Sequence, residues 1–132
     1  MNGPVSPVPN VDLRLEAEPE AAPIARHRLV AFAIDHGATA DLAARVALAV
    51  TEAVSNAVRH AYEDDHGSIT CQADIEDGLL EIVIADDGSG FRPTGTPGLG
   101  AGLAIIADCC DDFTITAGAE AGIEVWMRFA IA

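Results

Sequence analysis

Five segments of the chain carry the apolar and polar pattern of strands. They are residues 11–19, 68–77, 79–86, 113–118 and 123–132. In the first, Val11, Leu13 and Leu15 alternate with charged neighbours, which predicts a strand with one buried face. The dipeptide Asp77-Gly78 between the second and third segments is typical of a two-residue hairpin turn. The last two segments are expected to pair as a second hairpin.

Three other segments favour helices, namely residues 20–37, 42 to about 62, and 103–112. In the first, Ile24, Leu29, Phe32 and Ala33 mark one apolar face, and Gly37 is a plausible stop. Thr39 and Asp41 are both candidates for the N-cap of the second helix. Residues 63–67 are expected to form a turn, and the Gly- and Pro-rich residues 87–102 a loop.

The order of these elements predicts an α+β fold. It is a two-layer sandwich in which a mainly antiparallel sheet is covered on one face by helices. The 132 residues are expected to form one domain over residues 11–132, preceded by a flexible Pro-rich tail at residues 1–10. That tail lacks the basic start and apolar run of a secretion signal.

The composition narrows the choice of partners. A formal net charge of -14 disfavours binding to nucleic acid or to an anionic membrane, and no apolar run is long enough to span a bilayer. A phosphate ligand would need a metal ion and backbone dipoles to offset this charge. The three cysteines, Cys71, Cys109 and Cys110, suit neither a disulfide framework nor a metal site and are expected to be small buried residues in a reducing cytoplasm.

Polar residues recur every fourth position on the second helix. Glu52, Asn56 and His60 form one stripe, flanked by the small residues Ala53 and Ala57. The stripe is either the solvated face of an amphipathic helix or the wall of a site. In a site, the carboxylate would accept a proton and the amide oxygen would ligate a hard cation such as Mg²⁺.

Two glycine clusters follow the stripe along the chain. "ADDGSGF" ends a predicted strand and contains Asp86, Gly88 and Gly90, which are either an ordinary turn or a carboxylate facing a pocket. "GLGAGLAII" places Gly98 and its neighbours at the start of the third helix, where backbone N–H groups can bind phosphate. It is otherwise a flexible loop that leads into that helix.

These motifs and their order resemble the GHKL ATP-binding superfamily with its Bergerat fold, from about Leu13 to Phe129. The nearest resemblance is to the bacterial anti-sigma-factor serine kinases of the RsbW and SpoIIAB type, because "EAVSNAVRHAY" is similar to their N-box and "GLGAGLAIIADCCDDFTI" to their second glycine box. The resemblance implies a cytoplasmic ATP- and Mg²⁺-dependent serine/threonine kinase that regulates transcription in stress responses. Its implied partners are an anti-anti-sigma protein of the STAS fold and a sigma factor, and a homodimer is typical of the family.

The resemblance also implies roles for individual residues. Glu52 matches the catalytic carboxylate, Asn56 the Mg²⁺ ligand and Asp86 the acceptor for the adenine amine. The implied nucleotide contacts further include Gly88, Gly90, Gly98, Leu99, Gly100, Ala101 and Gly102. Arg26 resembles an arginine that engages protein partners, or else is an exposed helix arginine. His60 fits the motif but is expected to be structural.

Two departures from the family pattern bear on activity. Only seven residues, "FRPTGTP", separate Gly90 from Gly98, and Arg92 is the one cation among them, so the lid is short. Ile123 stands where the family usually has a threonine whose hydroxyl supports the adenine-side carboxylate, which predicts weaker ATP binding. The alternatives to a kinase are a non-catalytic regulator that acts by protein binding and an ATP-binding module that serves a separate sensor.

Overall fold

A computed structural model of the chain describes residues 10–62, 67–86, 99–117 and 122–131. These residues form strands β1 (Val11–Glu16), β2 (Ser68–Glu76), β3 (Leu79–Asp86), β4 (Asp112–Ala117) and β5 (Ile123–Ala130). They also form helices α1 (Ala21–Asp35), α2 (Ala40–Tyr62) and α3 (Leu99–Cys109).

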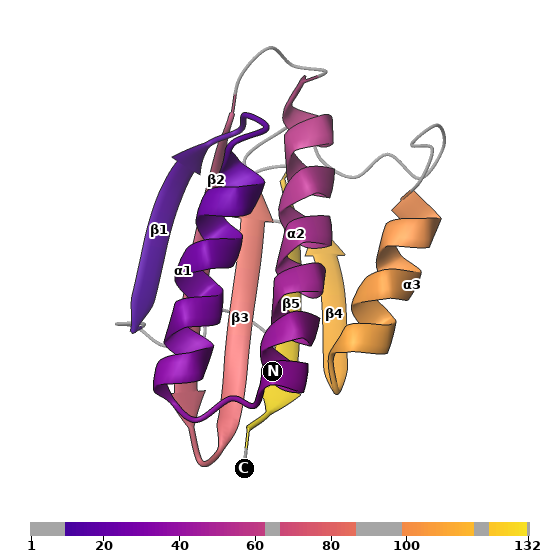
Figure 1. Cartoon of the computed structure of the whole chain (residues 1–132). Coiled ribbons are helices and arrows are strands. Elements are labelled where there is room, and N and C mark those ends of the chain that lie inside the picture. The colour runs from indigo at the N-terminus through magenta and orange to yellow at the C-terminus, as the bar shows by residue number, and fades with distance from the viewer. Residues whose placement is uncertain (1–9, 63–66, 87–98, 118–121, 132) are drawn as a thin grey trace.

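The strands make one antiparallel sheet in the order β1-β2-β3-β5-β4, and all three helices lie against the same face of it (Figure 1). The predicted α+β two-layer sandwich is therefore confirmed. Both predicted hairpins are present, since β2 pairs with β3 and β4 with β5. At the first turn, Asp77 and Gly78 both have positive φ, 54° and 76°, which is the requirement of the turn that the dipeptide predicts.

The core lies between the helices and the covered face of the sheet. Val46, Val50 and Val54 of α2 are fully buried there, four residues apart on one side of the helix. Opposite them, the inward side chains of β3 and β5 include Ile82, also fully buried. This packing fixes which side of α2 remains for other contacts.

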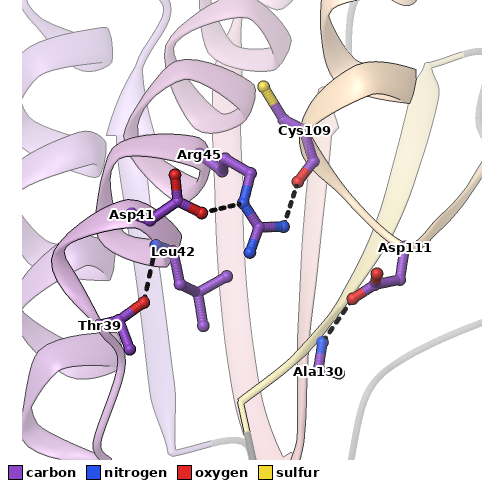
Figure 2. Close-up of polar contacts among 7 residues, drawn as sticks. All are labelled: Thr39, Asp41, Leu42, Arg45, Cys109, Asp111 and Ala130. Carbon is purple, nitrogen blue, oxygen red and sulfur yellow. Dashed lines mark hydrogen bonds and ion pairs between the residues drawn. The ribbon is translucent and has the colours of Figure 1, made fainter.

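The junction between α1 and α2 is set by two local signals. Gly37, with φ of 98°, donates its N–H to the carbonyl of Ile34 at 3.0 Å, and this left-handed residue closes α1. Thr39 is the N-cap of α2, because its Oγ1 accepts from the N–H of Leu42 at 3.1 Å (Figure 2). Asp41, the other candidate, lies within the first turn and pairs with Arg45 instead.

Several element boundaries differ from the prediction. Helix α3 begins at Leu99 and ends at Cys109, whereas a loop was expected through residue 102 and a helix through residue 112. The glycines of the expected loop lowered its apparent helix propensity, but α3 packs against α2, and tertiary packing overrides propensity. Strand β1 stops at Glu16, short of residue 19.

The buried face of α1 is also shifted from the predicted one. Leu29, Phe32 and Ala33 are buried as expected, but Ile24 is 50% exposed. Its place is taken by the fully buried Ala25, one residue further along the helix. The small Ala25 allows α1 to lie close to its neighbours, which a pattern of large apolar residues alone does not reveal.

One aromatic side chain lies on the face of the sheet away from the helices. Trp126 alternates with the core residues Val125 and Met127 along β5, so it projects to the opposite face. Its indole Nε1 donates to a carboxylate oxygen of Glu81 at 3.1 Å, and the guanidinium of Arg128 lies 5.4 Å from its ring centroid. Trp126 is nevertheless only 7% exposed.

Two expectations from composition concern membranes and thiols. No helix among the described residues has the length and apolar character needed to cross a bilayer. The three cysteines are free thiols. Cys71 and Cys109 are buried as expected, whereas Cys110 is only half-buried, and burial in the core raises the pKa of Cys71 to about 12.

Candidate nucleotide site

The polar stripe of α2 borders the core on one side and solvent on the other. Asn56 is 8% exposed and is the only buried polar side chain among the described residues. Glu52, one turn earlier, is half-buried. His60 continues the stripe in the backbone of α2, but its side chain lies outside the described part of the structure.

Asn56 already has a cationic partner. The guanidinium of Arg59, one turn further along α2, donates to the amide oxygen Oδ1 of Asn56. The oxygen that the sequence assigns to a metal ion is thus occupied by a guanidinium in this structure, and a divalent ion would have to displace it. The i,i+3 spacing of Asn56 and Arg59 is a sequence signal for this contact, but Arg59 does not lie in the polar stripe and was not predicted as a site residue.

Asp86 occupies the last position of β3, half-buried at the edge of the helical layer. The start of β5 approaches it closely. A Cβ atom placed on Gly122 would lie 1.7 Å from the backbone oxygen of Asp86 and 3.4 Å from its carboxylate. Only glycine fits there, so the close approach of the two backbones fixes where Asp86 stands.

A pocket of about 440 Å³, including its space open to solvent, lies between these two polar residues. Its lining is largely apolar and comes from α2, β3, α3, β4 and β5. The residues are Ala53, Asn56, Ala57, Ile84, Asp86, Leu103, Ile106, Ile115, Ile123 and Val125. A mainly apolar lining with a few polar groups is typical of a small-molecule site.

The pocket joins motifs that the sequence predicted separately. Asn56 from the helix stripe and Asp86 from the first glycine cluster line the same space, together with the small residues Ala53 and Ala57 that flank the stripe. Glu52 is not among the lining residues, and it lies one helical turn from Asn56 towards the N-terminus of α2. Ile123 of β5 was expected beside the Asp86 carboxylate and lines the pocket, whereas the rest of the apolar lining from α3, β4 and β5 was not foreseen, because it depends on how those elements pack.

The second glycine cluster is described only in part. Leu99, Gly100, Ala101 and Gly102 form the first turn of α3, whose leading backbone N–H groups have no partner within the helix. Leu103 of the next turn lines the pocket. Gly88, Gly90 and Gly98 lie outside the described residues, as does the short lid with Arg92.

Arg26 lies on α1, outside the pocket. Its Nη1 donates to Oγ1 of Thr51 on α2 at 3.3 Å, next to Glu52 in the chain. It also lines a groove between α1 and α2 with the apolar residues Val30 and Ile34. Arg26 therefore links the outer face of the helix pair to the turn that carries Glu52.

No cluster of three His, Cys, Asp or Glu side chains suited to a metal occurs in the part of the chain that the structure describes. In proteins, Mg²⁺ commonly keeps several waters and shares its other positions between one or two protein oxygens and bound phosphates. The residues present fit a purine nucleotide with such an ion. The apolar lining of the pocket includes a carboxylate and an amide oxygen, and the helix that contributes Leu103 and Ile106 begins one turn before Leu103.

The match to known proteins agrees with this geometry. The model of the histidine kinase-like ATPase domain matches residues 15–129, and the chain belongs to that family. The family match spans both the α2 stripe and the strand that ends at Asp86.

Among curated proteins, the chain is 35% identical over 82 residues to the serine-protein kinase RsbW of Bacillus subtilis (strain 168), covering 61% of this chain and 51% of that protein. It is 29% identical over 130 residues to the anti-sigma F factor of Clostridium acetobutylicum, covering 89% of this chain and 91% of that protein. The chain thus spans about half the length of the RsbW relatives that it matches.

A solved structure supports the fold. The RsbU and RsbW domains of Rv1364c from Mycobacterium tuberculosis superpose with a TM-score of 0.68 at 23% identity, covering 94% of this chain and 33% of that chain. The same arrangement of an antiparallel sheet and three helices therefore occurs in that structure.

The close approach at Gly122 generates a stability prediction. Gly122→Ala should lower the free energy of unfolding by about 3 kcal/mol, because the new methyl group meets a backbone oxygen that cannot move without shifting β3. Gly37→Ala is the matched control. No atom lies within 4 Å of its Cβ position, and its positive φ alone should cost about 1 kcal/mol.

Urea denaturation of both variants measures the difference. Equal losses in the two variants would show that the contact between Gly122 and Asp86 does not constrain the fold.

Proposed function

We propose that this protein is an ATP-dependent serine/threonine kinase and anti-sigma factor that acts in the cytoplasm. Its substrate would be a STAS-type anti-anti-sigma protein, and it would also sequester a sigma factor. The observation that carries the proposal is the apolar pocket bounded by Asp86 and Asn56, beside the first turn of α3. The names of the relatives, a serine-protein kinase and an anti-sigma factor, support it.

The apolar part of the pocket suits the adenine ring. Ile84, Ile106 and Val125 offer apolar surface to a flat aromatic base. The carboxylate of Asp86 is a hydrogen-bond acceptor, and the exocyclic amine of adenine is a donor that it can bind. Gly122 lets β5 approach without filling the space beside Asp86.

The phosphates would extend from the pocket towards Asn56 and α3. The amide oxygen of Asn56 is the proposed Mg²⁺ ligand, and the bound ion would supply the charge neutralisation that phosphates need in a chain of net charge -14. The N–H groups at the start of α3, in Leu99, Gly100, Ala101 and Gly102, are proposed to donate to phosphate oxygens. Gly88, Gly90 and Gly98 are proposed to complete the nucleotide contacts.

Glu52 is proposed as the base. A serine or threonine hydroxyl of the partner would give its proton to the Glu52 carboxylate as its oxygen bonds to the γ-phosphorus, and ADP would leave with the bridging oxygen. Glu52 is half-buried outside the adenine pocket, where a partner's hydroxyl can reach it.

The partner is proposed to dock on the outer face of α1 and α2. Arg26 on this face contacts Thr51, which directly precedes Glu52, so docking there would bring a hydroxyl close to the base. A homodimer is also proposed. The acidic charge disfavours nucleic acid and anionic membranes as partners.

A second candidate function is a regulator that binds protein but uses ATP weakly or not at all. Ile123 favours it, because this side chain lines the pocket at the end where Asp86 stands and offers no hydrogen bond. The two candidates differ in whether phosphate is transferred to a partner.

The first test concerns the base-recognition carboxylate. Asp86→Ala should weaken Mg-ATP binding by about tenfold or more, since a hydrogen bond to a charged group is lost. Calorimetric titration measures this, with Asp12→Ala on the exposed side of β1 as the control. If both variants bind like wild type, the nucleotide does not occupy this pocket.

The second test separates binding from transfer. Glu52→Gln should keep Mg-ATP affinity within about twofold but reduce phosphotransfer to an anti-anti-sigma protein by about 100-fold, because the amide cannot accept the proton. Radiolabelled ATP measures the transfer. Wild-type protein that binds ATP but transfers none would favour the non-catalytic regulator.

The third test concerns Ile123. Ile123→Thr should tighten ATP binding roughly tenfold, because its hydroxyl can hydrogen-bond beside the Asp86 carboxylate. Ile123→Val serves as the control for the loss of apolar volume. Unchanged affinity in the threonine variant would mean that Ile123 does not limit nucleotide binding.

A further inference from the structure

The C-terminal end of α3 is held by an arginine from another helix. Nη1 of Arg45 on α2 donates to the carbonyl oxygen of Cys109, the last residue of α3, at 3.1 Å (Figure 2). Nε of the same guanidinium donates to Oδ2 of Asp41 at 3.2 Å. The two donors are thereby fixed in different directions, which a single ammonium group cannot reproduce.

This contact supplies a charge that α3 lacks. The last turn of α3 contains no basic residue, although the partial negative charge at a helix C-terminus favours a cation there. Arg45 provides that cation from α2. It also satisfies one of the carbonyl groups that have no partner within α3.

A second attachment holds the chain just beyond α3. The N–H of Asp111 donates to the carbonyl of Arg128 at 2.9 Å, and its carboxylate accepts from the N–H of Ala130 at 2.7 Å (Figure 2). The C-terminal end of α3 is therefore tied to α2 on one side and to β5 on the other.

Helix α3 is about as long as the part of α2 between Arg45 and Asn56. The 11 residues of α3 span about 16 Å, and the 11 steps from Arg45 to Asn56 on α2 span about the same distance. The helices run in opposite directions (Figure 1). The bond from Arg45 to Cys109, termed the clamp, and the proposed phosphate-binding turn at Leu99 therefore lie at opposite ends of the helix pair.

We propose that Arg45 is a positioning residue, which sets where the N-terminal turn of α3 stands relative to Asn56. This inference rests on the proposed function, because the turn matters only if it meets the phosphates. Loss of the clamp would let α3 shift along α2. The phosphate end would then lose the alignment of its N–H groups, whereas the base end would lose only the α3 part of its lining and keep the residues of β3 and β5.

The experiment compares ATP with adenosine. In Arg45→Met, the affinity for Mg-ATP is expected to fall about tenfold more than that for adenosine, by calorimetry at a temperature where the protein is folded. Adenosine lacks the phosphates, so the ratio of the two affinities reports on the phosphate end alone. Hydrogen exchange in the nucleotide-free protein should be faster in α3.

Arg128→Met is the matched control. Its side chain is 38% exposed against 37% for Arg45, and it also pairs with an aspartate, Asp112 at 3.4 Å, but its side chain does not cap a helix. The control therefore removes the same charge and should keep the wild-type ratio. Asp41→Asn keeps the bond from Arg45 to Cys109, so its ratio of ATP affinity to adenosine affinity should stay close to that of the wild type.

The outcomes separate the two proposals. Wild-type protein that binds neither ligand would refute the proposed function and this inference with it. Wild-type binding with an unchanged ratio in Arg45→Met, or an equal change in Arg128→Met, would refute the inference alone. A lowered ratio only in Arg45→Met, with faster exchange in α3, would support it.

Discussion

The burial of one side of α2 against the sheet is the interaction on which the rest of the structure depends. Val46, Val50 and Val54 are fully buried, and each contributes about 1.5–3 kcal/mol relative to an exposed side chain. Because this side is committed to the core, the rotation of α2 about its axis is fixed. Asn56 is then held at the boundary between core and pocket, while Glu52 remains half-buried one turn away.

Much of the fold follows from local sequence. Alternation in β1 and β5, the Asp77-Gly78 turn and the Thr39 cap each act within a few residues, so the sequence alone predicts them. The start of α3 and the exposure of Ile24 were predicted wrongly, because each is decided by contacts with distant elements.

The candidate site likewise has residues that local motifs predict and contacts that depend on distant parts of the chain. Asn56 and Asp86 were predicted from motifs that lie within single elements, and the structure brings them to one pocket. The roles assigned to them stay predictions. The approach of Gly122 to Asp86 and the bond from Arg45 to Cys109 join residues 36 and 64 positions apart in sequence, which no local pattern encodes. These long-range contacts determine how precisely the predicted residues are placed.

The basic side chains of this acidic protein are few and are all arginine, since its seven Lys and Arg residues include no lysine. Three of them make hydrogen bonds to side chains of α2. Arg26 of α1 bonds to Thr51, Arg59 to Asn56, and Arg45 to Asp41 as well as to Cys109 of α3. The guanidinium group keeps its charge at any physiological pH and directs several donors at fixed angles. Two of the seven arginines thus lie on the helix that also carries the proposed catalytic residue, and a third contacts it from α1.

Trp126 gives the protein an internal optical reporter. It is the only tryptophan in the chain, and it lies on the sheet face opposite α2 and α3. Its indole is held between the carboxylate of Glu81 and the guanidinium of Arg128, so its fluorescence depends on the pairing of β3 with β5. The emission of this one residue therefore follows the integrity of the sheet, and the sheet separates the fluorophore from ligands bound beneath the helices.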